Sequence, residues 1–164
     1  MEGINKLDRR AFVERFGPLF EHSPWVAEAA WSDRPFTDVD DLFEALRTAV
    51  HAAPRERQLA LIRAHPDLAG GASIESTLTG RSRREQAAAG LDRLTPDEYE
   101  AFTRTNEAYR ARFGFPLVVC VREHTKQSIL RTAAERLGHS RDEELREALG
   151  EIAKIARLRL EEAL

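Results

Sequence analysis

The sequence has a single cysteine, Cys120, among its 164 residues. One thiol can form neither an intrachain disulfide nor a cysteine-based zinc site, because both need at least two. Cys120 lies between Val119 and Val121, which predicts a buried, inert thiol rather than a nucleophile. Pairs of the His-x-x-x-His or Glu-x-x-His type are also missing. We therefore expect no metal site.

Long hydrophobic runs and blocks of basic residues are absent as well. No apolar run approaches the roughly twenty residues that cross a bilayer, and the net charge is −3. We therefore expect no membrane span and no nucleic-acid partner. The first residues, Met1-Glu2-Gly3-Ile4-Asn5, lack the basic and then apolar pattern of a signal peptide. The simplest expectation is a cytoplasmic protein.

What the sequence does contain is helical periodicity. Hydrophobic residues make up 42% and charged residues 32% of the chain, an ordinary composition for one domain over residues 1–164. Apolar residues recur at spacings of three and four in nearly every segment. The pattern predicts an all-α, single-domain bundle of about seven or more helices.

Helix boundaries are marked by capping residues, prolines and glycines. Asp8, Ser23-Pro24, Asp38, Pro54, Ser82, Thr95-Pro96 and Ser140 with Glu143 are predicted to open helices. A further helix is predicted over about 126–137. Gly17-Pro18, Gly114 and Gly138 are predicted to close helices.

One short segment, 115–121, is apolar and strand-like rather than helical. No second strand is predicted to pair with it. Its backbone polar groups must nevertheless be satisfied if it is buried. Turning these groups toward a ligand or water is one solution.

His65 lies where the helix that begins at Pro54 should end, because Pro66 disfavours helical geometry in the residue before it. A histidine can donate or accept a proton near neutral pH. A cationic histidine at a helix C-terminus is an equally good interpretation, since the helix dipole favours it. The following residues, 66–81, are rich in Pro, Gly, Ser and Thr and are predicted to form an ordered functional loop or a mobile one.

Ser82 and Glu85 form a Ser-x-x-Glu pattern, which by itself predicts a capping box. The same helix N-terminus presents free N–H groups and a partial positive charge that suit a carbonyl or an anion. Gln86 adds an amide that both donates and accepts hydrogen bonds. Glu85 beside His65 could form an acid–base pair.

Arg159 falls on the apolar stripe of the last helix, three residues after Ala156 and four before Ala163. Arg157 falls to the side of that stripe. A buried arginine is rarely unpaired. Either it forms a salt bridge with a core acid such as Asp92, or it clamps a planar oxygenated ligand.

The sequence resembles the 2-oxo-4-hydroxy-4-carboxy-5-ureidoimidazoline (OHCU) decarboxylase family, which acts on the route from urate to allantoin. The matching segments follow the family order and cover nearly the whole chain: Ser23–Ala27, Arg34–Phe36, Ala64–Gly70, Ser82–Gln86, Ala89–Asp92, Asn106–Tyr109, Phe113–Cys120 and Ile155–Leu160. His-Pro-Asp-Leu alone would be a weak signal, whereas the whole set is specific.

The resemblance implies an all-helical, cofactor-independent carboxy-lyase that forms (S)-allantoin from a small-molecule substrate and is often a homodimer. It implies that His65 and Glu85 are the catalytic pair. It further implies substrate contacts from Pro66, Ser82, Gln86 and Arg159, and from backbone groups at Phe115, Val119 and Val121. The substrate-binding arginine of the family matches either Arg157 or Arg159 in this sequence. The position of Arg159 on the apolar stripe of the last helix favours Arg159.

Two other functions are compatible with such a fold. A non-catalytic helical binding module would be expected to lose His65, Glu85 or Arg159, and all three are present. A related enzyme acting on another ureido or purine-derived ring would be distinguished by a substrate assay.

Overall fold

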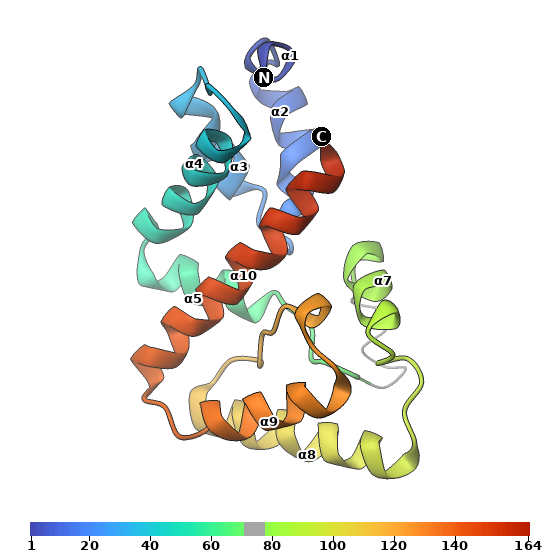
Figure 1. Ribbon diagram of the computed structural model, residues 1–164. Coiled ribbons are helices and arrows are strands. Elements are labelled where there is room, and N and C mark those ends of the chain that lie inside the picture. Colours follow the sequence, from blue (N-terminus) through green and yellow to red (C-terminus); the bar gives the residue numbers. More distant parts are fainter. Residues whose placement is uncertain (71–77) are drawn as a thin grey trace. The chain divides into compact units, whose positions relative to one another are not determined.

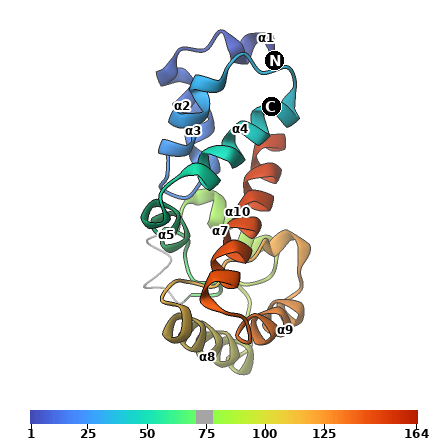
Figure 2. The same ribbon diagram turned by 90° about the vertical axis from the view of Figure 1, so that its left-hand side faces the viewer.

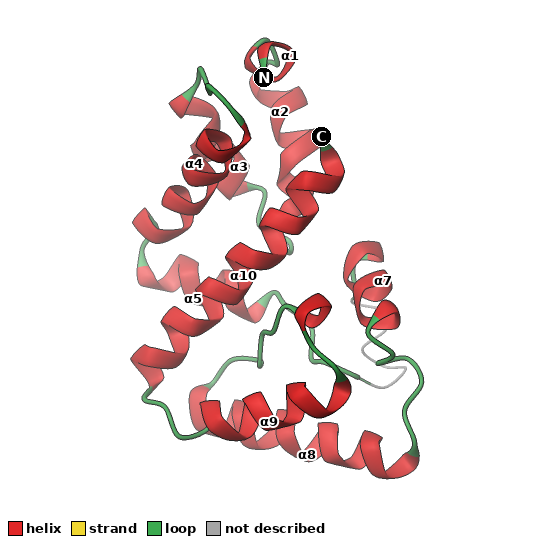
Figure 3. Ribbon diagram, viewed as in Figure 1, coloured by secondary structure: helices red, strands yellow, loops and turns green. Residues whose placement is uncertain are grey.

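The computed structural model describes residues 1–70 and 78–164 (Figure 1). Within these residues it has nine α-helices, three short 3-10 helices and no β-strand (Figure 3). The predicted all-α class with seven or more helices is therefore confirmed. The chain divides into two compact units, Met1–Ala64 with Ala153–Leu164, and His65–Ile152. The assignment of residues 1–164 to one domain stays a prediction.

The first unit is built from short helices whose starts follow the predicted caps. Its helices are α1 (Glu2–Asn5), α2 (Arg9–Phe16), α3 (Trp25–Ala30), α4 (Val39–Ala52) and α5 (Arg55–Arg63), with 3-10 turns at Gly17–Leu19 and Trp31–Asp33. The Asp8 side chain accepts a hydrogen bond from the Ala11 amide, and Asp38 accepts one from Asp41, both at 2.8 Å. The predicted Ser23 cap is wrong, because α3 starts after Pro24 without a side-chain cap.

Aromatic and aliphatic residues from several helices form the core of this unit. The rings of Phe12 and Phe16 lie 4.7 Å apart, and Phe36 stacks on Phe12 at 6.0 Å. α3 packs against both α2 and α4. The last turns of α10 (Arg141–Ala163) add Ala156 and Leu160, both buried.

The second unit contains α7 (Gly80–Ala88), α8 (Pro96–Phe113), the 3-10 turn η3 (Val121–Glu123), α9 (Lys126–Arg136) and the first part of α10. α8 and α9 lie side by side in both views (Figures 1 and 2). Thr95 caps α8, and Gly114 ends it with φ of 76°, which glycine adopts without strain. Ser140 and Glu143 cap α10 reciprocally, as predicted.

The start of α7 differs from the prediction. The helix begins at Gly80, and its cap is Thr79, whose hydroxyl accepts a hydrogen bond from the Ser82 amide at 3.3 Å. Ser82 therefore lies inside the first turn, and the predicted Ser82–Glu85 capping box is wrong. A threonine at the preceding turn competes successfully for the same role, since either hydroxyl can cap a helix.

The strand-like segment 115–121 is buried but forms no ladder with another part of the described chain. Charged side chains satisfy its backbone instead. Arg136 of α9 donates to the Val118 carbonyl, and Glu151 of α10 accepts from the Cys120 amide, both at 2.7 Å. Cys120 is buried, as its flanking valines predicted.

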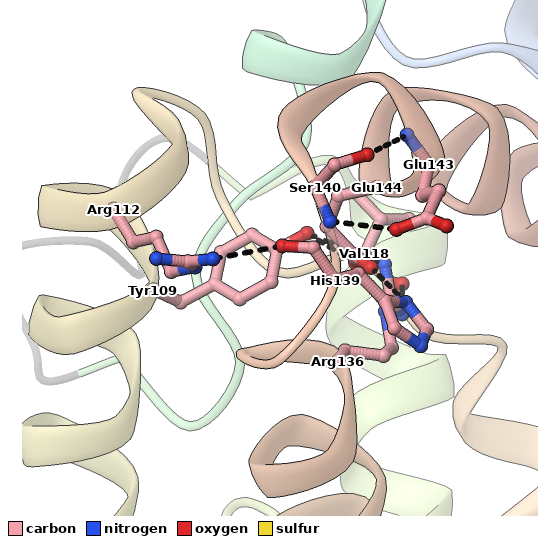
Figure 4. A network of polar contacts seen from close by, with 8 residues as sticks. All are labelled: Tyr109, Arg112, Val118, Arg136, His139, Ser140, Glu143 and Glu144. Atoms are coloured by element: carbon pink, nitrogen blue, oxygen red, sulfur yellow. Dashed lines mark hydrogen bonds and ion pairs between the residues drawn. The ribbon is translucent and has the colours of Figure 1, made fainter.

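Arg136 belongs to a buried polar network at one end of α10 (Figure 4). Glu144, which has no exposed surface, accepts hydrogen bonds from Arg136 and from the Tyr109 hydroxyl and pairs with His139 at 2.9 Å. Burial, reinforced by the hydrogen bond to Glu144, raises the pKa of Tyr109 far above its ordinary value. The Tyr109 hydroxyl therefore remains protonated and donates a hydrogen bond. The network fixes the Arg136 side chain, which in turn donates to the Val118 carbonyl.

Glu144→Ala is expected to lower the free energy of unfolding by about 3–5 kcal/mol, because it leaves Arg136 buried without its carboxylate. Urea unfolding followed by circular dichroism measures this loss. Glu147→Ala, an exposed change one turn further along α10, is the matched control and should have little effect. Equal losses in the two variants would contradict the assignment of Glu144 as the centre of the network.

Candidate active site

His65 lies at the exit of α5, as the sequence predicted. The helix ends at Arg63, Ala64 caps it, and Pro66 follows His65 directly. His65 is buried, as are Leu68 and Ala69. Ala69 adopts φ of 54°, a left-handed conformation that residues other than glycine seldom adopt. His65 therefore opens a sharply turned segment, His65–Ala69, that is buried at its start and end and partly exposed at Pro66 and Asp67.

Side chains from α7 and α8 hold this turn. Gln86 accepts a hydrogen bond from the Ala69 amide at 3.0 Å and donates to the Asp67 carbonyl at 3.4 Å. Asn106 of α8 donates to the Leu68 carbonyl at 2.8 Å. Arg110, one turn further along α8, pairs with the Asp67 carboxylate at 2.8 Å. These contacts give the non-helical backbone the partners that burial demands.

Sequence reasoning placed Asn106 in one of the matching segments but assigned no role to it or to Arg110. A signal for Asn106 was present, because Phe102, Asn106, Tyr109 and Phe113 form the buried stripe of α8. An amide on an otherwise apolar stripe needs a hydrogen-bonding partner, just as Arg159 does. Its partner, the Leu68 carbonyl, lies 38 residues earlier in the chain, so the sequence could not identify it.

α7 brings the remaining candidate residues of the second unit to the same region. Ser82 and Gln86 are buried, whereas Glu85 between them is partly exposed. α7 is tied to the turn through Gln86 and packs against η3, which begins at Val121. The buried segment that carries Phe115, Val119 and Val121 leads directly into η3. The His65–Ala69 turn, α7 and the 115–121 segment thus belong to one unit.

Arg159 belongs to the other unit and is 2% exposed. It donates to the Leu19 carbonyl at 3.2 Å and pairs with Glu21 at 2.9 Å. Asp92, suggested as its partner, instead lies beside Arg93 at 3.6 Å and is half-exposed. A buried salt bridge was therefore a correct expectation, but its partner was wrong.

The prediction that Arg159 lies on the buried face of the last helix and Arg157 beside it is confirmed. The Arg157 side chain is 33% exposed and pairs with Asp40 and Glu161 at the surface. These two carboxylates raise the pKa of the Arg157 guanidinium above its ordinary value, mainly through their hydrogen bonds. Only Arg159 is enclosed by the core.

Two further features of the described residues bear on function. No group of three or more His, Cys, Asp or Glu side chains there is arranged to hold a metal ion. None of the helices in that part of the chain combines the length and hydropathy required to cross a membrane.

The fold and these residues define an all-α protein in which a histidine, a carboxylate and two buried side-chain amides belong to one structural unit. The chain belongs to the OHCU decarboxylase family, whose sequence model matches residues 5–161.

Two relatives with the same name are similar over almost their full length. The chain is 48% identical to the 2-oxo-4-hydroxy-4-carboxy-5-ureidoimidazoline decarboxylase of Haloferax volcanii, covering 99% of this chain and 94% of that protein. It is 42% identical to the mouse protein of the same name, covering 100% and 92%. The chain is also 42% identical to the uric acid degradation bifunctional protein PucL of Bacillus subtilis. This match covers 98% of this chain but 32% of the longer protein.

Solved structures share the fold. An (S)-allantoin synthase superimposes with a TM-score of 0.79 at 28% identity, covering 99% of this chain and 53% of that one. An OHCU decarboxylase crystallised in the presence of (S)-allantoin superimposes with a TM-score of 0.73 at 20% identity, covering 91% and 96%. The second similarity is evidence for the fold alone.

Glu21→Ala is expected to destabilise the protein by about 3–5 kcal/mol, because Arg159 would stay buried without its carboxylate partner. Chemical denaturation measures the change. Asp40→Asn, which removes a surface partner of Arg157, is the matched control and should cause a much smaller loss. If Glu21→Ala were as mild as the control, the Glu21–Arg159 pair would not be a structural element of the first unit.

Proposed function

We infer that this chain catalyses the decarboxylation of 2-oxo-4-hydroxy-4-carboxy-5-ureidoimidazoline to (S)-allantoin during urate degradation. The observation that carries this inference is the family match over residues 5–161, together with relatives 42–48% identical along nearly their whole length. The presence of His65 and Glu85 in the second unit, with Gln86 tied to the His65 turn, supports it.

The substrate's own structure makes the reaction feasible without an added electron acceptor. When the bond between the ring carbon and the carboxylate breaks, CO₂ leaves. The electron pair forms a double bond to the ureido-bearing carbon, and the former C=N electron pair moves onto the ring nitrogen. The ring nitrogen and the ureido-bearing carbon must then each gain a proton, and the hydroxyl on the decarboxylated carbon loses its proton to become a carbonyl, so one proton is consumed in total. The protein must hold the ring and manage these proton transfers.

In this proposal His65 donates the proton to the ureido-bearing carbon from one face, which sets the chirality of allantoin. Glu85 accepts the hydroxyl proton or orients His65. The His65 side chain is buried, and a low-dielectric surrounding strengthens its electrostatic interaction with a bound anion.

Substrate positioning is assigned to Pro66, Ser82, Gln86, Arg159 and the backbone at Phe115, Val119 and Val121. The first turn of α7 places Ser82 near the positive end of the helix dipole, which suits an anionic substrate. The Gln86 amide oxygen accepts from Ala69, and one of its two N–H groups donates to the Asp67 carbonyl, so we assign any substrate contact of Gln86 to its second N–H.

His65→Ala and Glu85→Gln are expected to lower kcat at least about a hundredfold with the fold retained. The first removes the proposed proton donor, and the second removes the carboxylate that accepts the hydroxyl proton or orients His65. The unstable substrate is generated in situ from urate, and optical activity is followed as (S)-allantoin forms. His51→Ala, which changes an exposed histidine on α4, is the matched control. Near-normal rates in His65→Ala would refute its role. A racemic product at the uncatalysed rate from the unmodified protein would refute the proposed activity.

We also propose a cytoplasmic location, which the lone cysteine supports. We propose a homodimer because the family resemblance implies one. Light scattering coupled to size-exclusion chromatography should give a mass near twice 18.6 kDa. A mass near 18.6 kDa at micromolar concentration would argue against the dimer.

A further inference from the structure

The peptide group between Leu68 and Ala69 is held from both sides. Its carbonyl accepts a hydrogen bond from Asn106 Nδ2 of α8 at 2.8 Å, and its N–H donates to Gln86 Oε1 of α7 at 3.0 Å. The carbonyl and the N–H of one trans peptide point in opposite directions. Two helices therefore fix the orientation of this single peptide plane.

The turn requires such fixing. Ala69 has φ of 54°, and a residue other than glycine in this region is held there by its surroundings. The plane lies three residues after His65, and Pro66 restricts one of the intervening backbone torsions. Holding the Leu68–Ala69 peptide thus limits how far the His65 backbone can rotate or shift.

Packing alone does not explain an asparagine at position 106. It is 8% exposed on a stripe otherwise made of Phe and Tyr side chains, where an apolar residue would bury more favourably. Its Oδ1 has no hydrogen-bonding partner among the described residues. The benefit of an amide at this position is therefore the hydrogen bond that Nδ2 donates.

We propose that Asn106 is a positioning residue for the decarboxylation, acting on His65 through the Leu68 carbonyl. The proposal rests on the proposed function, because it assigns Asn106 the task of keeping the proton donor in place. A misplacement of about 1 Å in a reacting group can cost about a hundredfold in rate. Substrate binding depends on other groups and should change little.

The test compares two variants. Asn106→Leu removes the donor together with the unpartnered oxygen but leaves the buried Leu68 carbonyl without this hydrogen bond. Its melting temperature should therefore fall, and kcat is measured at a temperature at which circular dichroism shows the variant to be folded. Its kcat is expected to fall about ten- to a hundredfold, with KM within about threefold of the unmodified value. Asn106→Asp is nearly isosteric and cannot donate while ionised. As the pH falls and its carboxyl group is protonated, the donor returns, so its kcat relative to the unmodified enzyme should rise.

Thr95→Ala is the matched control, because it removes the N-cap of the same helix without touching the turn. It should lower the melting temperature and leave kcat unchanged. If Asn106→Leu had the same kcat as the unmodified protein, the positioning role would be overturned while the proposed function stayed intact. An equal loss of kcat in Thr95→Ala would have the same consequence. An inactive unmodified protein would overturn the proposed function and the positioning role with it.

Discussion

Buried backbone that is neither helix nor strand must find hydrogen-bond partners outside itself, and this constraint governs the second unit. Among the described residues of this unit, two such segments are the His65–Ala69 turn and the 115–121 run. Each is held by polar side chains projecting from helices, Gln86 and Asn106 for the first, Arg136 and Glu151 for the second. Leaving such groups unpaired would cost roughly 1–3 kcal/mol each.

The same constraint explains why polar residues occupy apolar stripes in this chain. Asn106 on α8, Glu144 and Glu151 on α10, and Arg159 near the C-terminus are all buried. Each bonds to a backbone group or to an oppositely charged partner. The segments so held include those that the family resemblance associates with the substrate. Structural support and the candidate active site are therefore parts of one arrangement.

Local signals predicted most of the helix boundaries, because caps and glycines act within a few residues of the chain. Asp8, Asp38, Thr95 and Gly114 behave as predicted. The errors also arose locally, where two residues could serve the same purpose. Thr79 rather than Ser82 caps α7, and α3 starts without the Ser23 cap. The central part of the predicted 66–81 loop lies outside the described residues.

By itself the sequence determined the all-α class, the helix exit at His65, the burial of Arg159 and the family resemblance. These depend on periodicity, on proline and glycine, and on motif order, all of which are local or linear properties. Only the tertiary structure decided that Glu21 rather than Asp92 pairs with Arg159, and that Asn106 and Gln86 hold the His65 turn. A hydrogen bond between residues 38 positions apart depends on how helices pack, and no spacing in the sequence specifies that.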